Sequence, residues 1–281
     1  MKEVIIIGSG PAGITAGIYL TRSNIKNTVI TNNTGSLKKA DKIENYYGFE
    51  KPISGEKLIE NGINQYINLG GNIIEDEVVG LTYEDKLVVK GTKENYQADY
   101  VVIATGISRL LPNINGLSDK LGISYCAICD AFFYRDKDVV VIGNGKYAKA
   151  EADILCKTSK SVKVLSNGKD FMCDFSCDTE KRKISSVSKI NTKFEIKFED
   201  DSILVTDGIF IAEGIAGAMA LAKKIGAKTE NNKIIVNDKM KTNIPNLYAV
   251  GDCNGGIYQI SKAVYDGTIA ALEIIKENKK E

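Results

Sequence analysis

The chain has 281 residues, of which 37 are basic and 36 are acidic, and its formal net charge is +1. This balance gives no basis for binding nucleic acid or a membrane surface. The length fits one or two domains, and no apolar segment approaches the roughly 18 residues of a membrane span. Six cysteines without an apolar leader favour a reducing cytosol, so we expect a soluble cytoplasmic protein.

The first recognisable unit is a strand, a glycine turn and a helix. Residues 4–7 are predicted to form a buried parallel strand that runs into the sequence GSGPAG at 8–13, and residues 14–20 are predicted to be helical. A G-x-G-x-x-G turn in this setting lets a pyrophosphate approach the backbone at the helix N-terminus. The next predicted strand, 27–30, ends in Thr31-Asn32-Asn33 and lacks the acid that commonly binds an NAD ribose.

Further elements of the same kind are separated along the chain. A buried strand at 100–103 ends in the sequence ATG at 104–106, and a late strand at 247–250 runs into Gly251-Asp252. Apolar spacing predicts helices at 55–69 and 259–276, and polar turn residues predict a hairpin at 77–90.

A second strand, glycine turn and helix lies between these parts. The predicted strand at 139–142 leads to GNGKYA at 143–148 and a helix at 150–156, and further strands are predicted at 162–165, 194–198, 203–205 and 208–212. We therefore predict an α/β fold with two Rossmann-like domains. The first is discontinuous, comprising residues 1–110 and 214–281, and a smaller domain, 111–213, is inserted into it.

A Cys-x-x-Cys pair followed by a carboxylate lies near the middle of the chain, at Cys126, Cys129 and Asp130. Two thiols at this spacing can close a small disulfide, and the acid can manage the proton when it opens. Alone, the spacing is compatible with redox or metal chemistry. A structural zinc site usually needs four Cys or His ligands, and the chain has no histidine, so no metal is expected.

Together, GSGPAG at 8–13, ATG at 104–106, CAICDAFFYR at 126–135 and GD at 251–252 resemble the low-molecular-weight thioredoxin reductases. The resemblance covers essentially the whole chain. It implies a homodimer with FAD in the first domain and the redox pair in the second. It also implies that Cys129 lies against the flavin, that Cys126 attacks the thioredoxin disulfide, and that Asp130 is the acid–base group.

The resemblance extends to the residues that would hold FAD. Asn45 matches a position beside the flavin, and Asp252 a position on its ribityl or phosphate side. Gln259 begins a helix whose positive end favours negative charge on the flavin, although Tyr258 replaces the arginine that usually precedes it. The residues expected to contact FAD are Gly8, Ser9, Gly10, Pro11, Ala12, Gly13, Thr31, Asn32, Asn45, Val78, Ala104, Thr105, Gly106, Gly251, Asp252, Gln259 and Ile260.

The second glycine turn departs from the family pattern, which is close to GGGNSA. Lys146 and Tyr147 stand where small residues would admit a pyrophosphate. The His-Arg-Arg cluster that holds the NADPH 2′-phosphate is replaced by VLSNG at 164–168, although such a phosphate is normally met by an arginine fork. Arg135 precedes the first strand of this domain and Arg182 lies well beyond the second. For NADH, Asp170 is the only nearby acid.

These departures make the chain most similar to the ferredoxin-dependent flavin thioredoxin reductases of clostridia. That resemblance implies electron transfer from reduced ferredoxin through FAD and the Cys126–Cys129 disulfide to thioredoxin. Two alternatives remain at this point. One is an NADPH- or NADH-dependent thioredoxin reductase with an atypical nucleotide site. The other is a flavoprotein-like scaffold that binds a partner without a working cysteine pair.

The other four cysteines have no assigned role. Cys173 and Cys177 are four residues apart and could share one face of a helix, and with Cys156 they are three candidate ligands for an iron–sulfur cluster. Such a cluster usually needs four cysteines, so free or buried thiols are the alternative. Cys253, beside Asp252, is interpreted as a small packing residue.

Overall fold

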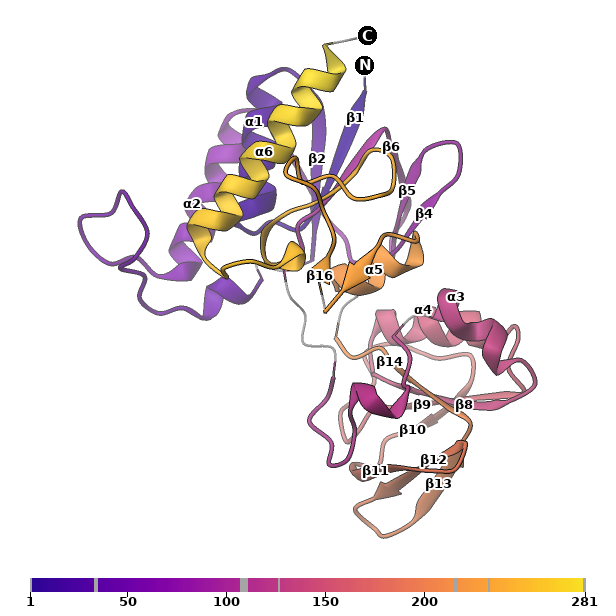
Figure 1. The fold of residues 1–281 in the computed structure, drawn as a ribbon. Helices are drawn as coiled ribbons and strands as arrows, with labels where there is room; N and C mark the ends of the chain where they lie inside the picture. Colours follow the sequence, from indigo (N-terminus) through magenta and orange to yellow (C-terminus); the bar gives the residue numbers. More distant parts are fainter. Residues whose placement is uncertain are drawn as a thin grey trace. The chain divides into compact units, whose positions relative to one another are not determined.

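The computed structural model describes residues 2–32, 35–106, 111–125, 127–214, 217–231 and 233–279. The chain divides into two compact units, which Figure 1 shows. Residues 1–108 and 217–281 form the first, called here the terminal unit, and residues 109–216 form the inserted unit. No helix within the described ranges is long and apolar enough to cross a membrane.

The terminal unit is built on a parallel sheet of five strands in the order β17-β7-β1-β2-β3. Ile7 at the end of β1 pairs with Ile30 of β2 on one side and with Ile103 of β7 on the other. The carboxyl ends of these strands therefore meet along one edge of the sheet. The strands are β1 (Glu3–Ile7), β2 (Lys26–Thr31), β3 (Asn72–Glu75), β7 (Tyr100–Ile103) and β17 (Leu247–Ala249).

Three helices cover one face of this sheet: α1 (Pro11–Arg22), α2 (Gly55–Asn68) and α6 (Ile260–Asn278), as Figure 1 shows. Their apolar faces form a single core with the sheet, in which Leu20, Tyr66 and Ile274 are fully buried. The α1 and α6 helices pack very closely, because a β-carbon at Gly267 would lie 2.2 Å from the Ala12 carbonyl oxygen. A helix from the end of the chain is thus fitted against the first glycine turn.

Antiparallel elements complete the terminal unit. A three-stranded sheet is held at one end by Asp76, a buried carboxylate that accepts hydrogen bonds from the backbone of Glu77, Thr92 and Lys93 and from the hydroxyls of Thr92 and Tyr96. The elements are β4 (Val78–Tyr83), β5 (Leu87–Gly91), β6 (Asn95–Ala98), the helix α5 (Ala218–Lys224), the pair β15 (Thr229–Glu230) and β16 (Lys233–Ile234), and the 3-10 turns η1 (Ser36–Lys39) and η4 (Gly251–Asn254).

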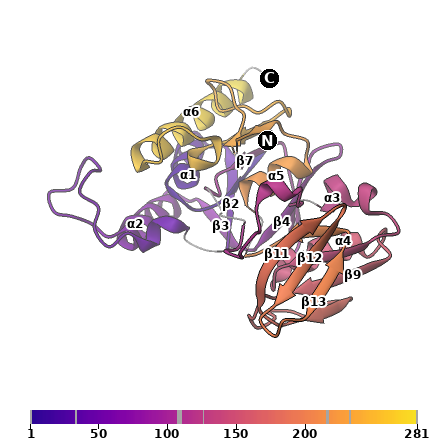
Figure 2. The ribbon, with the colours of Figure 1, turned by 60° about the horizontal axis from the view of Figure 1, so that its bottom comes forward.

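The inserted unit has a parallel sheet of four strands in the order β10-β9-β8-β14. An antiparallel sheet of β11, β12 and β13 packs against it through Phe194, Ile196 and Phe198, and Figure 2 shows these three strands side by side. The strands of the inserted unit are β8 (Asp138–Ile142), β9 (Ser161–Leu165), β10 (Asp178–Glu180), β11 (Ile184–Ile190), β12 (Lys193–Phe198), β13 (Ile203–Thr206) and β14 (Gly208–Ile211). Its helices are η2 (Asp119–Leu121), α3 (Ala127–Asp130), η3 (Ala131–Tyr134) and α4 (Lys146–Leu155).

Both predicted strand–turn–helix units are present, and the predicted hairpins are confirmed. The predicted α4 began at residue 150, but the helix starts at Lys146, because Tyr147 and Ala148 are already buried against the unit. The prediction that Cys173 and Cys177 share a helix face is wrong, since residues 171–177 are not helical. The Met172 amide bonds to the Asn144 carbonyl oxygen and β10 begins directly after Cys177, which leaves no room for a helical turn.

Candidate active site

The first glycine turn contains two kinds of glycine. Gly8 has a φ of +111°, and a β-carbon there would lie 2.6 Å from the Ala104 carbonyl oxygen. At Gly13 a β-carbon would lie 2.0 Å from the Gly8 carbonyl oxygen. Close packing therefore requires glycine at both positions. Gly10 is different, because no described atom outside its chain neighbours lies within 4 Å of the place its β-carbon would take. The turn thus leaves open space at the N-terminus of α1.

Several predicted residues meet around this opening. The Ser9 and Thr31 hydroxyls are 3.0 Å apart and hydrogen-bonded, which joins the glycine turn to the end of β2. The Thr105 hydroxyl, just beyond β7, is buried and has no hydrogen-bond partner in the described part of the chain. An unpaired buried hydroxyl costs about 1–3 kcal/mol, so this position suits a ligand atom. Asn32 is exposed directly after β2, and Val78 is buried at the start of β4.

The loop at Gly251 and Asp252 is held from behind by α6. The Gly251 amide donates to the Asp266 carboxylate at 3.0 Å, and the Lys262 ammonium donates to the Gly251 carbonyl oxygen at 2.7 Å. Lys262 and Asp266 also form an ion pair at 2.8 Å. Burial raises the pKa of Asp252, while the positive charge of Lys262 opposes that shift and Asp266 adds to it. Sequence reasoning missed both helical residues, whose only signal is the i, i+4 spacing of a lysine and an acid.

Two other predicted residues, far apart in the sequence, lie together in the terminal unit. The Asn45 side-chain amide donates to the Gln259 side-chain oxygen at 3.1 Å. Gln259 is the N-cap of α6, and Ile260 is the first residue of that helix. Both Asn45 and Gln259 are exposed, so they can face a ligand at this end of α6.

The redox segment of the inserted unit is described in part. Cys126 lies outside the described residues, and Cys129 belongs to α3, which begins at Ala127. The Asp130 carboxylate accepts a hydrogen bond of 2.6 Å from the Ser124 hydroxyl. Ser124 is itself fixed to β14, because its amide donates to Ile209 and its carbonyl oxygen accepts from Ile211. The predicted acid–base group is therefore oriented by a buried serine that sequence reasoning missed.

The second glycine turn is covered by the chain itself. The Asn144 side-chain amide donates to the Asp170 carbonyl oxygen at 2.9 Å, and the Met172 amide donates to the Asn144 carbonyl oxygen at 2.8 Å. A β-carbon at Gly145 would lie 3.7 Å from the Met172 sulfur. Residues 170–172 thus lie over the turn where a nucleotide pyrophosphate would approach.

An ion pair adds to this cover. Lys169 follows β9 and pairs with Glu213, which follows β14. Because β9 and β14 flank β8 in the sheet, this pair spans the end of β8, from which the second glycine turn emerges. In open parallel sheets, ligands bind outside the carboxyl ends of the strands. In the inserted unit, protein groups occupy that place.

The positions that would carry phosphate-binding arginines also have structural roles. Ser166 is buried, and its hydroxyl donates to the Lys169 carbonyl oxygen at 2.6 Å. Asn167 has a φ of +52°, and its side-chain oxygen accepts from the Ile184 amide at 2.8 Å. Arginine at either position would break these bonds.

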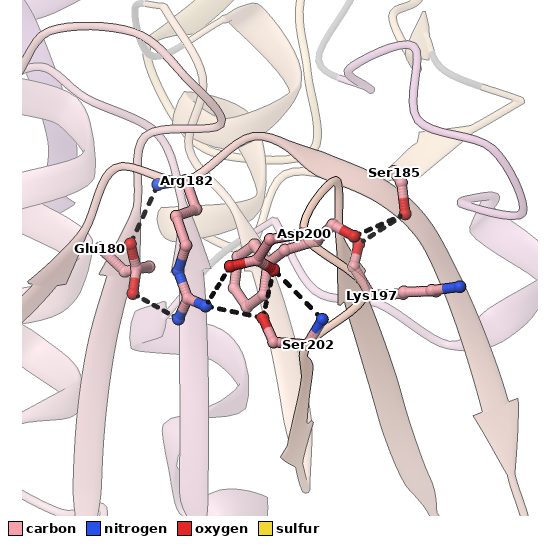
Figure 3. Close-up of polar contacts among 7 residues, drawn as sticks. Glu180, Arg182, Ser185, Lys197, Asp200 and Ser202 are labelled. Carbon is pink, nitrogen blue, oxygen red and sulfur yellow. Dashed lines mark hydrogen bonds and ion pairs between the residues drawn. The ribbon is translucent and has the colours of Figure 1, made fainter.

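Arg182, which follows β10, already has partners. Figure 3 shows its guanidinium between Glu180, at 2.7 Å, and Asp200, at 3.0 Å, with Ser202 also bonded at 2.6 Å. The hydrogen bond from Ser202 and the Arg182 charge lower the pKa of Asp200 to about 2. Two carboxylates therefore already balance this positive charge.

The candidate acid for an NADH ribose, Asp170, is similarly engaged. Its carboxylate is exposed and pairs with the ammonium of Lys181, whose hydrogen bond and charge lower the pKa of Asp170. Its backbone carbonyl oxygen is the group that holds Asn144. Asp170 thus helps to close the second turn.

The remaining cysteines show no metal site. Cys253 is buried, its thiol donates to the Val250 carbonyl oxygen at 3.2 Å, and burial raises its pKa to about 12, as expected of a packing residue. Cys156 and Cys177 lie close enough for their thiols to interact. Burial, and then the charge and hydrogen bond of Cys156, raise the pKa of Cys177 to about 12. Among the described side chains, no group of three or more Cys, Asp or Glu is placed to hold a metal ion.

Two parallel-sheet units, an open dinucleotide turn and a Cys-x-x-Cys segment define a disulfide oxidoreductase of the double Rossmann type. Residues 2–267 match the description "Pyridine nucleotide-disulphide oxidoreductase", and the chain belongs to that family. It is 33% identical to the thioredoxin reductase of Rickettsia prowazekii, in an alignment that covers 98% of this chain and 97% of that protein. It is 30% identical to the thioredoxin reductase of Bacillus subtilis, in an alignment that covers 97% of this chain and 93% of that protein.

Solved structures narrow the class further. An atypical thioredoxin reductase from Desulfovibrio vulgaris Hildenborough is 32% identical, with a TM-score of 0.92 over 100% of this chain and 99% of that one. A ferredoxin-flavin thioredoxin reductase from Clostridium acetobutylicum is 30% identical, with a TM-score of 0.74 over 100% of this chain and 99% of that one. Within its family, the chain is a low-molecular-weight thioredoxin reductase, and the predicted α/β fold is confirmed.

Proposed function

We propose that the protein passes electrons from reduced ferredoxin, through FAD and a Cys126–Cys129 disulfide, to thioredoxin. The observation that carries this proposal is the covered edge of the inserted sheet, where Asn144 is hydrogen-bonded to both Asp170 and Met172. An enzyme with a flavin-type site but a filled nucleotide site needs a donor other than NAD(P)H. The ferredoxin-flavin name of a similar clostridial structure agrees with this choice.

The terminal unit fits FAD on its own observations. Gly10 leaves open space at the N-terminus of α1, where backbone amides and the helix dipole favour a pyrophosphate. The buried Thr105 hydroxyl offers an unused hydrogen bond, and Gln259 begins a helix whose positive end favours negative charge. When bound, FAD supplies a carrier that can take up electrons singly and deliver them in pairs to a disulfide.

The chain's own thiols then carry out the exchange with thioredoxin. The Cys126 thiolate attacks one sulfur of the thioredoxin disulfide, forming a mixed disulfide and releasing the other sulfur as a thiolate. Cys129 attacks the Cys126 sulfur, which closes the disulfide and frees the second thioredoxin sulfur. Asp130, oriented by Ser124, supplies a proton to the leaving thiolate. One disulfide bond forms as one breaks, and two electrons reach thioredoxin.

The alternative is an NADPH- or NADH-dependent thioredoxin reductase with an atypical nucleotide site. The family description, which names a pyridine nucleotide, favours it. The residues that would hold the nucleotide, however, have the structural roles described above.

The proposal also includes a homodimer and a cytoplasmic location, where thiols are kept reduced. Light scattering of the purified protein tests the dimer, which should have twice the mass of the chain.

The decisive experiment follows flavin absorbance anaerobically in a stopped-flow instrument. The oxidised protein is mixed with reduced ferredoxin, NADPH or NADH, and thioredoxin reduction is measured in parallel. We expect flavin bleaching and thioredoxin reduction with ferredoxin only. Rapid bleaching by micromolar NADPH or NADH would overturn the choice of donor. Failure of thioredoxin reduction with every donor would overturn the reductase proposal itself.

Partial repairs of the second turn provide a matched series. Tyr147→Ser removes a bulky side chain but adds no donor for a phosphate. Arginines at Ser166 and Asn167 add charge but break the bonds to Lys169 and Ile184. We expect NADPH oxidation near background in both variants, at equal flavin content. Turnover on the order of 1–10³ s⁻¹ in either one would show a working nucleotide site.

Serine variants test the roles of the two sulfurs. Cys126→Ser should retain flavin and form no mixed disulfide with thioredoxin. Cys129→Ser leaves the attacking thiol without its resolving partner, so a stable adduct should accumulate, visible by non-reducing electrophoresis. The reverse pattern would exchange the two roles.

A further inference from the structure

Helix α4 holds the backbone on both sides of Cys126 through two side chains. The Tyr147 hydroxyl donates to the Tyr125 carbonyl oxygen at 3.0 Å. The Ala127 amide donates to a carboxylate oxygen of Glu151 at 2.5 Å. Tyr147 and Glu151 are four residues apart, on one face of α4, and both are almost fully buried. The redox segment is thus fixed to a rigid helix immediately before and immediately after its first cysteine.

These contacts explain what the unusual second turn does in this chain. Tyr147 comes two residues after Gly145, at the start of α4, where the family pattern has a small residue that admits a nucleotide. Here the tyrosine ring is buried and its hydroxyl faces the redox segment. Burial and the nearby Glu151 charge raise the pKa of Tyr147, so it remains a neutral hydrogen-bond donor. The start of α4 has a structural role toward the cysteines.

Glu151 adds an electrostatic effect to this support. Its carboxylate accepts the hydrogen bond of the amide that joins Ala127 to Cys126, so its charge lies against the peptide unit that follows this cysteine. A buried negative charge close to a thiol disfavours the thiolate. A stabilised thiolate favours the reduced form of a cysteine pair. Destabilising the thiolate therefore lowers the reduction potential of the pair and makes the dithiol a stronger reductant.

We infer that Glu151 is a positioning residue that lowers the reduction potential of the Cys126–Cys129 pair, while Tyr147 fixes the backbone on the other side of Cys126. The inference rests on the proposed function, because it takes these cysteines as the redox pair. A strongly reducing pair suits a protein whose task is to reduce another protein's disulfide.

The experiment measures the potential of the pair directly. Wild type and variants are equilibrated anaerobically in dithiothreitol buffers of graded oxidation, trapped by alkylation, and the peptide that carries Cys126 and Cys129 is quantified by mass spectrometry. Glu151→Gln removes the charge while its side-chain oxygen can still accept from the Ala127 amide. Asp153→Asn is the matched control, because it makes the same charge change on the same helix, at a residue bonded to Ser176 instead.

We expect Glu151→Gln to shift the midpoint at least tenfold toward the reduced pair, which is about 30 mV for a two-electron couple. Asp153→Asn should shift it less than threefold. Tyr147→Phe, which keeps the charge, should also leave the midpoint within threefold while slowing thioredoxin reduction. An equal midpoint in Glu151→Gln and Asp153→Asn would overturn the inference, since removing the Glu151 charge would then have no more effect than removing a charge elsewhere on α4.

A second variant decides the case if Glu151→Gln does not fold, as judged by flavin content and circular dichroism. Glu151→Asp draws the charge back from the Ala127 amide by one methylene, so a smaller shift in the same direction is expected, and a wild-type midpoint would overturn the inference. The midpoint measurement needs neither ferredoxin nor thioredoxin. A pair that forms no disulfide in any buffer would instead refute the proposed function.

Discussion

Gly10→Ala separates binding from folding at the first glycine turn. Gly10 has φ −71° and ψ 177°, which alanine adopts freely, and no described atom outside its chain neighbours lies within 4 Å of the new methyl group. The protein without flavin should therefore be as stable as wild type, or more stable by about 0.4–1 kcal/mol through the restricted unfolded chain. The methyl group instead enters the space proposed for the FAD pyrophosphate.

The cost to FAD binding can be worked out. If the methyl group displaces the pyrophosphate from one backbone amide, a charge-assisted hydrogen bond of about 1.5–3 kcal/mol is lost, which weakens binding roughly 10- to 150-fold. Flavin at one hundred times its Kd stabilises the wild type by about 2.7 kcal/mol. A hundredfold weaker Kd leaves about 0.4 kcal/mol of that stabilisation.

Two measurements test the reasoning, flavin content after purification and Tm with and without added FAD. In Gly10→Ala, Tm without FAD should match or exceed wild type, while the increase on adding FAD should nearly vanish. Gly13→Ala is the contrasting control, because its methyl group would lie 2.0 Å from the Gly8 carbonyl oxygen and should prevent folding in either condition. Undiminished FAD affinity in Gly10→Ala would refute the proposed position of the pyrophosphate.

Three further outcomes are expected. In Gly71→Ala the new methyl group would lie 2.3 Å from the buried Tyr66 ring, so urea unfolding should show a loss of about 1–3 kcal/mol, and an unchanged midpoint would contradict the packing. Burial opposes the low pKa of Asp76, but hydrogen bonds led by that of Thr92 outweigh burial and lower the pKa below 3.8. The carboxylate therefore stabilises the fold above pH 4, and this stabilisation fades as the pH falls further. Asp76→Asn should flatten the pH dependence of acid unfolding, and an unaltered acid midpoint would contradict this expectation. Buried Cys253, with a pKa of about 12, should resist iodoacetamide at pH 8 until urea is added, and rapid labelling of the native protein would show that it is not a packing residue.

The sequence was informative where structure is local. The runs 4–7 and 139–142 followed by glycine turns predicted β1, α1, β8 and α4, because buried strands, glycine turns and helices each depend on neighbouring residues. Short elements were missed. The four-residue β3 has one apolar pair, and β10 has none, so neither carries a periodic signal; each forms because a neighbouring strand offers a partner.

The active site was predictable in its residue types and less so in its contacts. The departure of GNGKYA from the family pattern was visible in the sequence, but the cover over the turn was not. Asn144 and Asp170 are 26 residues apart, and Lys169 and Glu213 follow different strands. Likewise, nothing in the sequence around Tyr147 indicates that its hydroxyl reaches Tyr125. Such pairings depend on the tertiary fold, which a motif does not specify.

The division of the terminal unit has a consequence for synthesis on the ribosome. The inserted unit is one continuous segment, 109–216, and can complete its core while the end of the chain is still being made. The terminal unit cannot, since β17 and α6 come last and α6 must pack against α1 at Gly267. The loop that carries Asp252 also waits for Lys262 and Asp266. During translation the unit that carries the Cys-x-x-Cys segment is therefore assembled before the unit proposed to hold FAD.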